Sequence, residues 1–216
     1  MIGKLSFAAK VIKPGRLFLR RLIDLSASFS SPSHHIYLNL EARADISWWS
    51  KFISQWNGVS IIQEPTVFAS DIVLSTDAAL HSGFGVVFGP RWAFGPWPPQ
   101  FSHWEIGPKE FLAIFVAISL WKDRLRNKQV VLYTDSLSST QVWISGVSKD
   151  PSYMRVLRPL FFLCAVNNIN LLLHHVDDHL NILADALSRF QLTKFRELHP
   201  FADADPTPVP NNLWIL

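Results

Sequence analysis

The spacing of apolar residues changes near residue 70 of the chain. Before that point, apolar residues recur three or four positions apart in two segments, which predicts two helices. Pro14 opens the first and Gly58 closes the second, positions at which helices favour these residues. The two predicted helices span residues 14–25 and 41–58. We therefore predict a small helical segment over residues 1–66, followed by a linker over residues 67–70.

From residue 71 the pattern becomes one of short apolar strands separated by Gly-rich turns and long apolar helices. The predicted strands span residues 71–78, 83–89, 91–97, 129–135 and 169–176, and the predicted helices span 107–125, 136–146, 151–168 and 181–190. The first three strands are close enough to form an antiparallel meander, whereas helical crossovers make the last two parallel to the first. The predicted fold class is α/β, a mixed five-stranded sheet with helices on both faces over residues 71–191.

The positions of the prolines lead to two further predictions. Pro159 lies inside the helix predicted for residues 151–168, so we expect that helix to be bent or broken there. Four prolines and few periodic signals follow Thr193. We therefore predict an extended C-terminal tail over residues 192–216.

Composition narrows the class of protein. Apolar residues make up 49% of the 216 residues, enough for a sizeable core, and the net charge is only +3. Residues 1–25 hold six basic side chains and one acid, which suits a polyanion or an acidic partner, or equally a solvated helix face. Cys164 is the only cysteine and lies in an apolar run, so it is expected to be a buried hydrophobe in a reducing compartment.

The N-terminus lacks the pattern of a signal peptide, because lysines interrupt its apolar residues. The longest apolar run, residues 111–121, is shorter than the roughly 20 residues that span a bilayer. We expect a protein of the cytoplasm or nucleus with no membrane partner. The sequence leaves its oligomeric state open.

Four acidic residues occupy related positions in the predicted fold. Asp77 lies on the first strand and Asp135 ends the fourth, so their carboxylates meet at one edge of the sheet if these strands are parallel neighbours. Glu110 opens the long helix and can reach the same point. Asp185, one turn after Asn181, can approach it from the final helix. The pattern therefore predicts a cluster of four carboxylates.

Carboxylates packed together repel one another and must be neutralised or bind cations. An all-oxygen ligand set favours Mg²⁺ or Mn²⁺ over zinc, and two such ions about 4 Å apart serve phosphoryl displacement. Taken singly, two of the acids have simpler interpretations. Asp135 would cap the helix that starts at Ser136, and Glu110 would be a first-turn acid favoured by the helix dipole.

The segments that hold these acids resemble the four motifs of retroelement ribonuclease H domains, in particular the domain that follows the polymerase in DIRS-type retrotransposons. They read LSTDAALHSGFGVVFG, IGPKEFLAIFVAI, VVLYTDSLSS and NILADALSRF. Upstream, IGKLSFAAKVIKPGRLFLRRLIDL and ARADISWWSKFISQWNG resemble the thumb and connection region of the same family's reverse transcriptase. FRELHPFADADPTPVP resembles the segment after the ribonuclease H domain.

The resemblance implies a ribonuclease H-like fold with metal ligands at Asp77, Glu110, Asp135 and Asp185. It implies cleavage of the RNA strand of an RNA–DNA hybrid with two Mg²⁺ ions, for which Mn²⁺ can substitute, leaving a 3′-hydroxyl. His179 falls where some ribonucleases H place a mobile histidine near the product phosphate, which makes it a further catalytic candidate. Four hydroxyl residues are candidates for contacts with the hybrid backbone, although Ser136 is better explained as a cap: Ser75, Thr76, Ser136 and Ser138.

Several features of the sequence bear on whether this resemblance extends to an intact enzyme. The loop HHVDDHLN carries Asp177 and Asp178, which would bind metal or repel substrate, and the third motif reads TDS where many relatives have TDN. Residues 136–168 have no Lys-rich insertion that would bind the hybrid, so tight binding of the hybrid would depend on a reverse transcriptase polymerase domain. The polymerase motif of paired aspartates after an aromatic residue is missing. The chain thus resembles a C-terminal fragment of a reverse transcriptase or a gene derived from one, and the alternative to a nuclease is an inactive remnant that binds nucleic acid or a protein.

Two other side-chain groups have competing interpretations. His174, His175 and His179 suggest zinc, but the first two point to opposite faces of a strand and cannot share one ion. Three tryptophans suit either stacking on nucleic acid or packing in the protein, and we favour packing. They are Trp92, Trp97 and Trp104.

Overall fold

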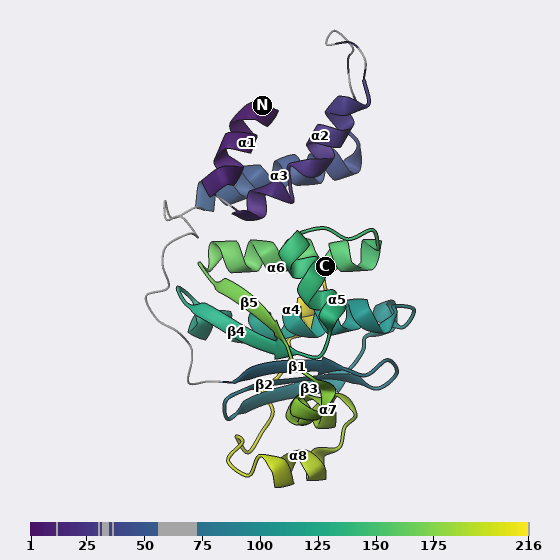
Figure 1. Cartoon of the computed structure of the whole chain (residues 1–216), viewed down its shortest axis with the longest axis vertical. Helices are drawn as coiled ribbons and strands as arrows, with labels where there is room; N and C mark the ends of the chain where they lie inside the picture. The colour runs from purple at the N-terminus through teal and green to yellow at the C-terminus, as the bar shows by residue number, and fades with distance from the viewer. Residues whose placement is uncertain (12, 30, 32–34, 36, 56–72, 216) are drawn as a thin grey trace. The chain divides into compact units, whose positions relative to one another are not determined.

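The computed structural model describes residues 1–11, 13–29, 31, 35, 37–55 and 73–215. The chain divides into two compact units, Met1–Glu64 and Pro65–Leu216. The predicted linker over residues 67–70 and the boundaries on either side of it lie outside the described residues. Figure 1 shows the elements of each unit.

The first unit is helical, as predicted, but its elements differ from the prediction. They are α1 (Ile2–Val11), η1 (Lys13–Arg16), α2 (Arg20–Ala27) and α3 (Leu40–Gln55). The single helix expected over residues 14–25 is interrupted, and α1 was not predicted. Gly15 lies against the ring of Trp49, where a Cβ atom would come within 2.5 Å of the ring, and Trp49 Nε1 donates to the carbonyl oxygen of Phe18 at 3.2 Å. Packing on α3 therefore overrides the local periodicity.

The second unit contains the predicted sheet, in the order β3-β2-β1-β4-β5. Its strands are β1 (Leu74–Ala78), β2 (Gly83–Phe88), β3 (Arg91–Pro96), β4 (Gln129–Thr134) and β5 (Asn170–His175). The first three pair antiparallel, and β4 pairs parallel with both β1 and β5. The mixed five-stranded sheet is confirmed.

Helices cover both faces of this sheet, which confirms the predicted fold class. They are α4 (Ile106–Leu125), α5 (Leu137–Ser145), α6 (Pro151–Val166), α7 (Ile182–Ser188) and α8 (Leu192–Leu198), with short turns η2 (Pro99–Phe101), η3 (Asp178–Leu180) and η4 (Asn211–Trp214). Figure 1 shows α4, α5 and α6 on one side and α7 on the other. Because both faces are covered, β1 and β2 are buried along their whole length.

α6 is one continuous helix that contains Pro159, so the helix is not broken there; a bend at this proline stays a prediction. Buried residues on both sides of the proline, Leu157 and Leu160, belong to the face that packs in the core. The irregular backbone lies in α4, where Trp121 has φ −114° and ψ 16°. Packing on both sides of Pro159 therefore supports the helix past a residue that lacks a backbone donor.

The C-terminal tail is not simply extended, because it contains α8 and packs on the sheet. Phe195 is fully buried, with its ring centroid 5.0 Å from that of Trp92. Further along, the backbone N–H of Asp203 donates to the carbonyl of Pro90 at 2.8 Å, and that of Thr207 donates to the carbonyl of Trp92 at 2.7 Å. The tail therefore belongs to the second unit, and the prediction of an extended segment is wrong for residues 192–198.

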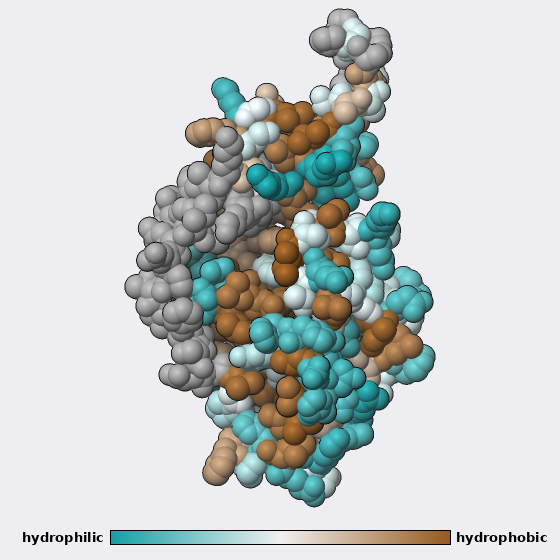
Figure 2. Space-filling model, viewed as in Figure 1, coloured by the Kyte–Doolittle hydropathy of each residue, from teal (hydrophilic) through white to brown (hydrophobic). Residues whose placement is uncertain are grey.

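Among the described residues, no helix has the length and apolar character needed to cross a membrane. Figure 2 shows polar and apolar residues interspersed over the viewed face of the second unit.

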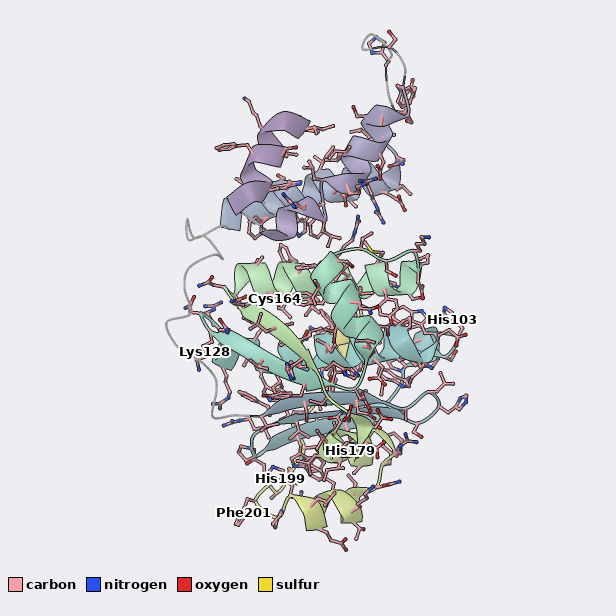
Figure 3. All side chains as sticks on the ribbon, viewed as in Figure 1. His103, Lys128, Cys164, His179, His199 and Phe201 are labelled. Atoms are coloured by element: carbon pink, nitrogen blue, oxygen red, sulfur yellow. The ribbon has the colours of Figure 1, made fainter. Side chains whose placement is uncertain are left out.

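Cys164 is buried on α6, as expected, and its thiol is free. Figure 3 labels it on the ribbon.

Candidate metal centre

Asp77 and Asp135 lie side by side because β1 and β4 are parallel neighbours. The register pairs Leu74 with Leu132 and Ser75 with Tyr133, so positions three residues after the first pair are Asp77 and Asp135. Asp77 is on β1, and Asp135 directly follows β4. Both carboxylates therefore emerge at the carboxyl edge of the parallel strands, where sites in such sheets form.

Glu110 joins these two acids from the first turns of α4, which packs on β1. One carboxylate oxygen from each of Asp77, Glu110 and Asp135 can be chosen so that all three lie within 4.8 Å of one another. Three of the four acids predicted from the sequence are thus brought together, from two strands and a helix. No other group of three candidate ligands with this spacing occurs in the described part of the chain.

The buried oxygens of this cluster indicate what it can hold. Asp77 is 4% exposed and Glu110 is 8% exposed. Among the described residues, Oε2 of Glu110 and Oδ1 of Asp135 are buried without a hydrogen-bond partner. A buried carboxylate oxygen with no partner is costly unless a cation neutralises it. The residues present therefore fit a divalent cation, and their all-oxygen donor set is of the type that Mg²⁺ and Mn²⁺ prefer.

The acid cluster also shifts the protonation of its members. Burial raises the pKa of Asp77 to about 7; a hydrogen bond from Ser188 opposes this change and the negative charges of Asp135 and Asp185 reinforce it. Burial, together with the charges of Asp77 and Asp135, raises the pKa of Glu110 well above its ordinary value. Burial likewise raises the pKa of Asp135. A bound cation would offset the penalties that oppose ionisation.

Asp185 lies beside the cluster but is held by another partner. Its Oδ1 accepts a hydrogen bond from Nε of Arg189 at 2.5 Å, four residues later on α7. Its negative charge contributes to the raised pKa of Asp77, which places it near that carboxylate. Asp185 is not one of the three acids whose oxygens gather within 4.8 Å. Its role as the fourth ligand stays a prediction.

The structure adds two residues that the sequence interpretation missed, the last residue of α7 and its C-cap. Ser188 donates its hydroxyl to Oδ2 of Asp77, and Arg189 pairs with Asp185. They follow Asp185 by three and four positions, the spacing at which side chains share one helix face. That spacing was the available signal for the pair with Arg189, whereas the contact of Ser188 with Asp77 depends on how α7 docks on the sheet.

The loop before α7 supplies the remaining candidates. His179 is exposed in η3, and Figure 3 shows it near α7. Its proposed part in product release stays a prediction. The charge of Asp178 helps to raise the pKa of both Glu110 and Asp135, so this loop adds negative charge near the cluster.

The hydroxyl residues beside the acids divide into two groups. Ser136 is the N-cap of α5 and accepts a hydrogen bond from the backbone N–H of Ser139 at 3.3 Å, which confirms its capping role. Ser75 and Thr76 are buried within β1, so the prediction that they contact a hybrid backbone is disfavoured. Ser138 is exposed and its hydroxyl lies 2.7 Å from that of Tyr153. It stays a candidate contact.

The zinc and stacking alternatives find no support in these positions. A ring nitrogen of His175 lies 3.1 Å from the carbonyl oxygen of Asp135, whereas the ring of His174 contacts that of Tyr133. Trp92 and Trp104 are buried, and Nε1 of Trp97 donates to the carbonyl of Ala79. The tryptophans therefore pack within the unit, as favoured from the sequence.

The fold and the site together define an α/β protein with a carboxylate centre at the carboxyl edge of a mixed five-stranded sheet. No protein family model matches the chain, and no curated protein matches it. Among solved structures, the chain is similar to RNase H1 from the halophilic archaeon Halobacterium salinarum NRC-1. The two share 18% sequence identity with a TM-score of 0.43, over 56% of this chain and 97% of that one. A likeness at this distance does not assign an activity.

Proposed function

We propose that this protein is a ribonuclease H-type endonuclease that cuts the RNA strand of an RNA–DNA hybrid with bound divalent cations. The observation that supports this proposal most directly is the convergence of Asp77, Glu110 and Asp135, with buried carboxylate oxygens that have no protein partner among the described residues. Such a centre is suited to phosphodiester hydrolysis, in which anionic oxygens must be held and stabilised.

The proposed cations are Mg²⁺, with Mn²⁺ as a substitute. When bound, they would supply an activated water molecule and stabilise the oxygen that leaves the scissile phosphate. Asp77, Glu110 and Asp135 would hold them, with Asp185 as the proposed fourth ligand. His179, exposed in η3, is proposed to assist the release of product. Neutral ligands in place of these carboxylates would leave the cation without its main source of affinity.

We propose that the substrate is recognised by its helical shape and by the 2′-hydroxyls that distinguish the RNA strand. Ser138, exposed at the start of α5 and close in sequence to Asp135, is a candidate contact. The motifs NILADALSRF and VVLYTDSLSS favour an origin in a DIRS-type retrotransposon. The helical segment predicted over residues 1–66 would then derive from the thumb and connection region, and an associated polymerase domain would strengthen hybrid binding.

Two observations favour the alternative of an inactive remnant that still binds nucleic acid or a protein. Asp185 is engaged by Arg189, and Asp178 adds negative charge near the cluster. The pairing of Asp185 with Arg189 would weaken the binding of a second cation, and the negative charge of Asp178 would repel an anionic substrate. Hybrid binding without metal-dependent turnover is the result that distinguishes this alternative.

The change Asp135→Asn tests the proposal. It removes a ligand charge at nearly constant shape, so cleavage of a labelled hybrid should fall by more than about 100-fold, because even the partners of metal ligands are worth about 10- to 100-fold. The matched control is Asp123→Asn, an exposed acid on α4 outside the cluster, which should cut like the wild type. Circular dichroism checks that both variants fold. Cleavage by Asp135→Asn at near the wild-type rate would rule out the proposed nuclease site.

A further inference from the structure

Ser188, the last residue of α7, contacts one of the carboxylates of the acid cluster. Its side chain is completely buried, and its hydroxyl oxygen contacts both Oδ2 of Asp77 and, at 2.9 Å, the carbonyl oxygen of Asp185. A serine hydroxyl has one proton to donate. An ionised carboxylate is a stronger acceptor than a backbone carbonyl, so the proton is directed to Asp77 when that residue is charged.

The close approach of α7 to the sheet is what brings Ser188 to Asp77. Gly85 is the partner of Asp77 in the pairing of β1 with β2. A Cβ atom at Gly85 would lie 2.3 Å from the carbonyl oxygen of Ala184 and 2.7 Å from the backbone nitrogen of Ser188. The missing side chain at Gly85 therefore makes room for the end of α7 directly above Asp77.

The start of α7 is fixed to the same strand. Nδ2 of Asn181 donates to the carbonyl oxygen of Thr76 at 2.9 Å, and Asn181 is buried. The helix is thus tied to β1 by Asn181 before its first turn and by Ser188 in its last. With both ends held, the hydroxyl of Ser188 has a defined position relative to the carboxylate.

We propose that Ser188 is a positioning residue for the metal centre. It holds Oδ2 of Asp77 and so orients the carboxylate with Oδ1 available to the cation. This inference rests on the proposed cation site and adds to it a residue that touches neither the substrate nor the cation. A hydrogen bond to the second oxygen of a ligating carboxylate fixes its orientation, and losing such a partner commonly weakens metal binding by about 10- to 100-fold.

Calorimetric titration of the full chain with Mn²⁺ tests the inference without any cleavage. Ser188→Ala should bind Mn²⁺ about 10- to 100-fold more weakly than the wild type. The rate of hybrid cleavage at saturating Mn²⁺ should fall less than the affinity does, because the ligand itself is still present. Ser119→Ala is the matched control: it removes a buried hydroxyl on α4 that has no hydrogen-bond partner among the described residues. It should bind Mn²⁺ like the wild type.

Ser188→Cys separates the hydrogen bond from packing. It retains a side chain of similar size but has only a weak donor, so it should bind Mn²⁺ nearly as weakly as Ser188→Ala. Wild-type affinity in the cysteine variant, or in a folded alanine variant, overturns the positioning role and leaves the proposed function standing. A wild-type chain that fails to bind Mn²⁺ overturns the cation site itself, and the role of Ser188 with it.

Discussion

Asp77 should make the metal-free protein less stable as the pH rises. The change Asp77→Asn removes a buried negative charge at nearly constant shape. Burial raises the pKa of Asp77 from 3.8 to about 7, so the unfolded chain loses this proton at a lower pH than the folded chain does. The folded state binds more protons than the unfolded state between these values, which means that stability falls as the pH rises through this range.

The size of the effect follows from the two pKa values. A change of one pKa unit corresponds to about 1.4 kcal/mol, so a shift from 3.8 to about 7 corresponds to a total on the order of 4 kcal/mol. The favourable contribution is complete below the unfolded pKa and is lost by the time the pH exceeds the folded pKa. Between about pH 5 and about pH 8, the wild type should lose roughly 2–3 kcal/mol relative to Asp77→Asn.

Urea unfolding in EDTA measures this difference directly. The free energy of unfolding of the wild type, Asp77→Asn and the exposed-acid control Asp123→Asn would be compared at the two pH values. Asp77→Asn should be the more stable protein at the higher pH, while Asp123→Asn should follow the wild type. Adding Mg²⁺ at that pH should stabilise the wild type, because the cation binds only the folded state, and should stabilise Asp77→Asn much less. The same pH dependence in all three proteins would mean that Asp77 does not have a raised pKa in the folded protein.

Three further changes test the packing around the site, all by urea unfolding. Gly85→Ala places a Cβ atom 2.3 Å from the backbone of α7 and should lower the free energy of unfolding by more than about 2 kcal/mol. In the control Gly95→Ala, the Cβ atom meets only the edge of the Phe84 ring at 3.3 Å, so the loss should be smaller. Equal losses would argue against the close approach of α7 to Gly85. Ser136→Ala removes the cap of α5 and should cost about 1 kcal/mol; no loss would contradict the capping role. Phe195→Ala should cost about 3–5 kcal/mol, because the ring is fully buried, and a near-neutral result would mean that α8 is not part of the core.

The sheet could be predicted because its signals are local. Apolar runs bounded by turn residues mark each strand, and the short or helical connections between them decide which pairs are antiparallel or parallel. Once β1 and β4 are parallel neighbours, Asp77 and Asp135 must emerge at one edge. The convergence of these two acids therefore follows from the strand order alone.

The parts that could not be predicted depend on contacts between segments far apart in the sequence. The segment LTKFREL has a single fully buried residue, Phe195, so its periodicity gives no sign of α8. Its stability comes from packing on Trp92, about a hundred positions earlier. The partner of Ser188 is equally distant, and only the approach of α7 to Gly85 reveals it.

The most direct test of the metal-dependent nuclease is cleavage of an RNA–DNA hybrid by the purified chain, with each strand labelled separately. If the protein is this nuclease, Mg²⁺ or Mn²⁺ supports cutting of the RNA strand only, the products carry 3′-hydroxyls, and EDTA abolishes the reaction. A folded, cation-binding protein that leaves the RNA strand intact in the presence of either ion would rule out the proposed activity.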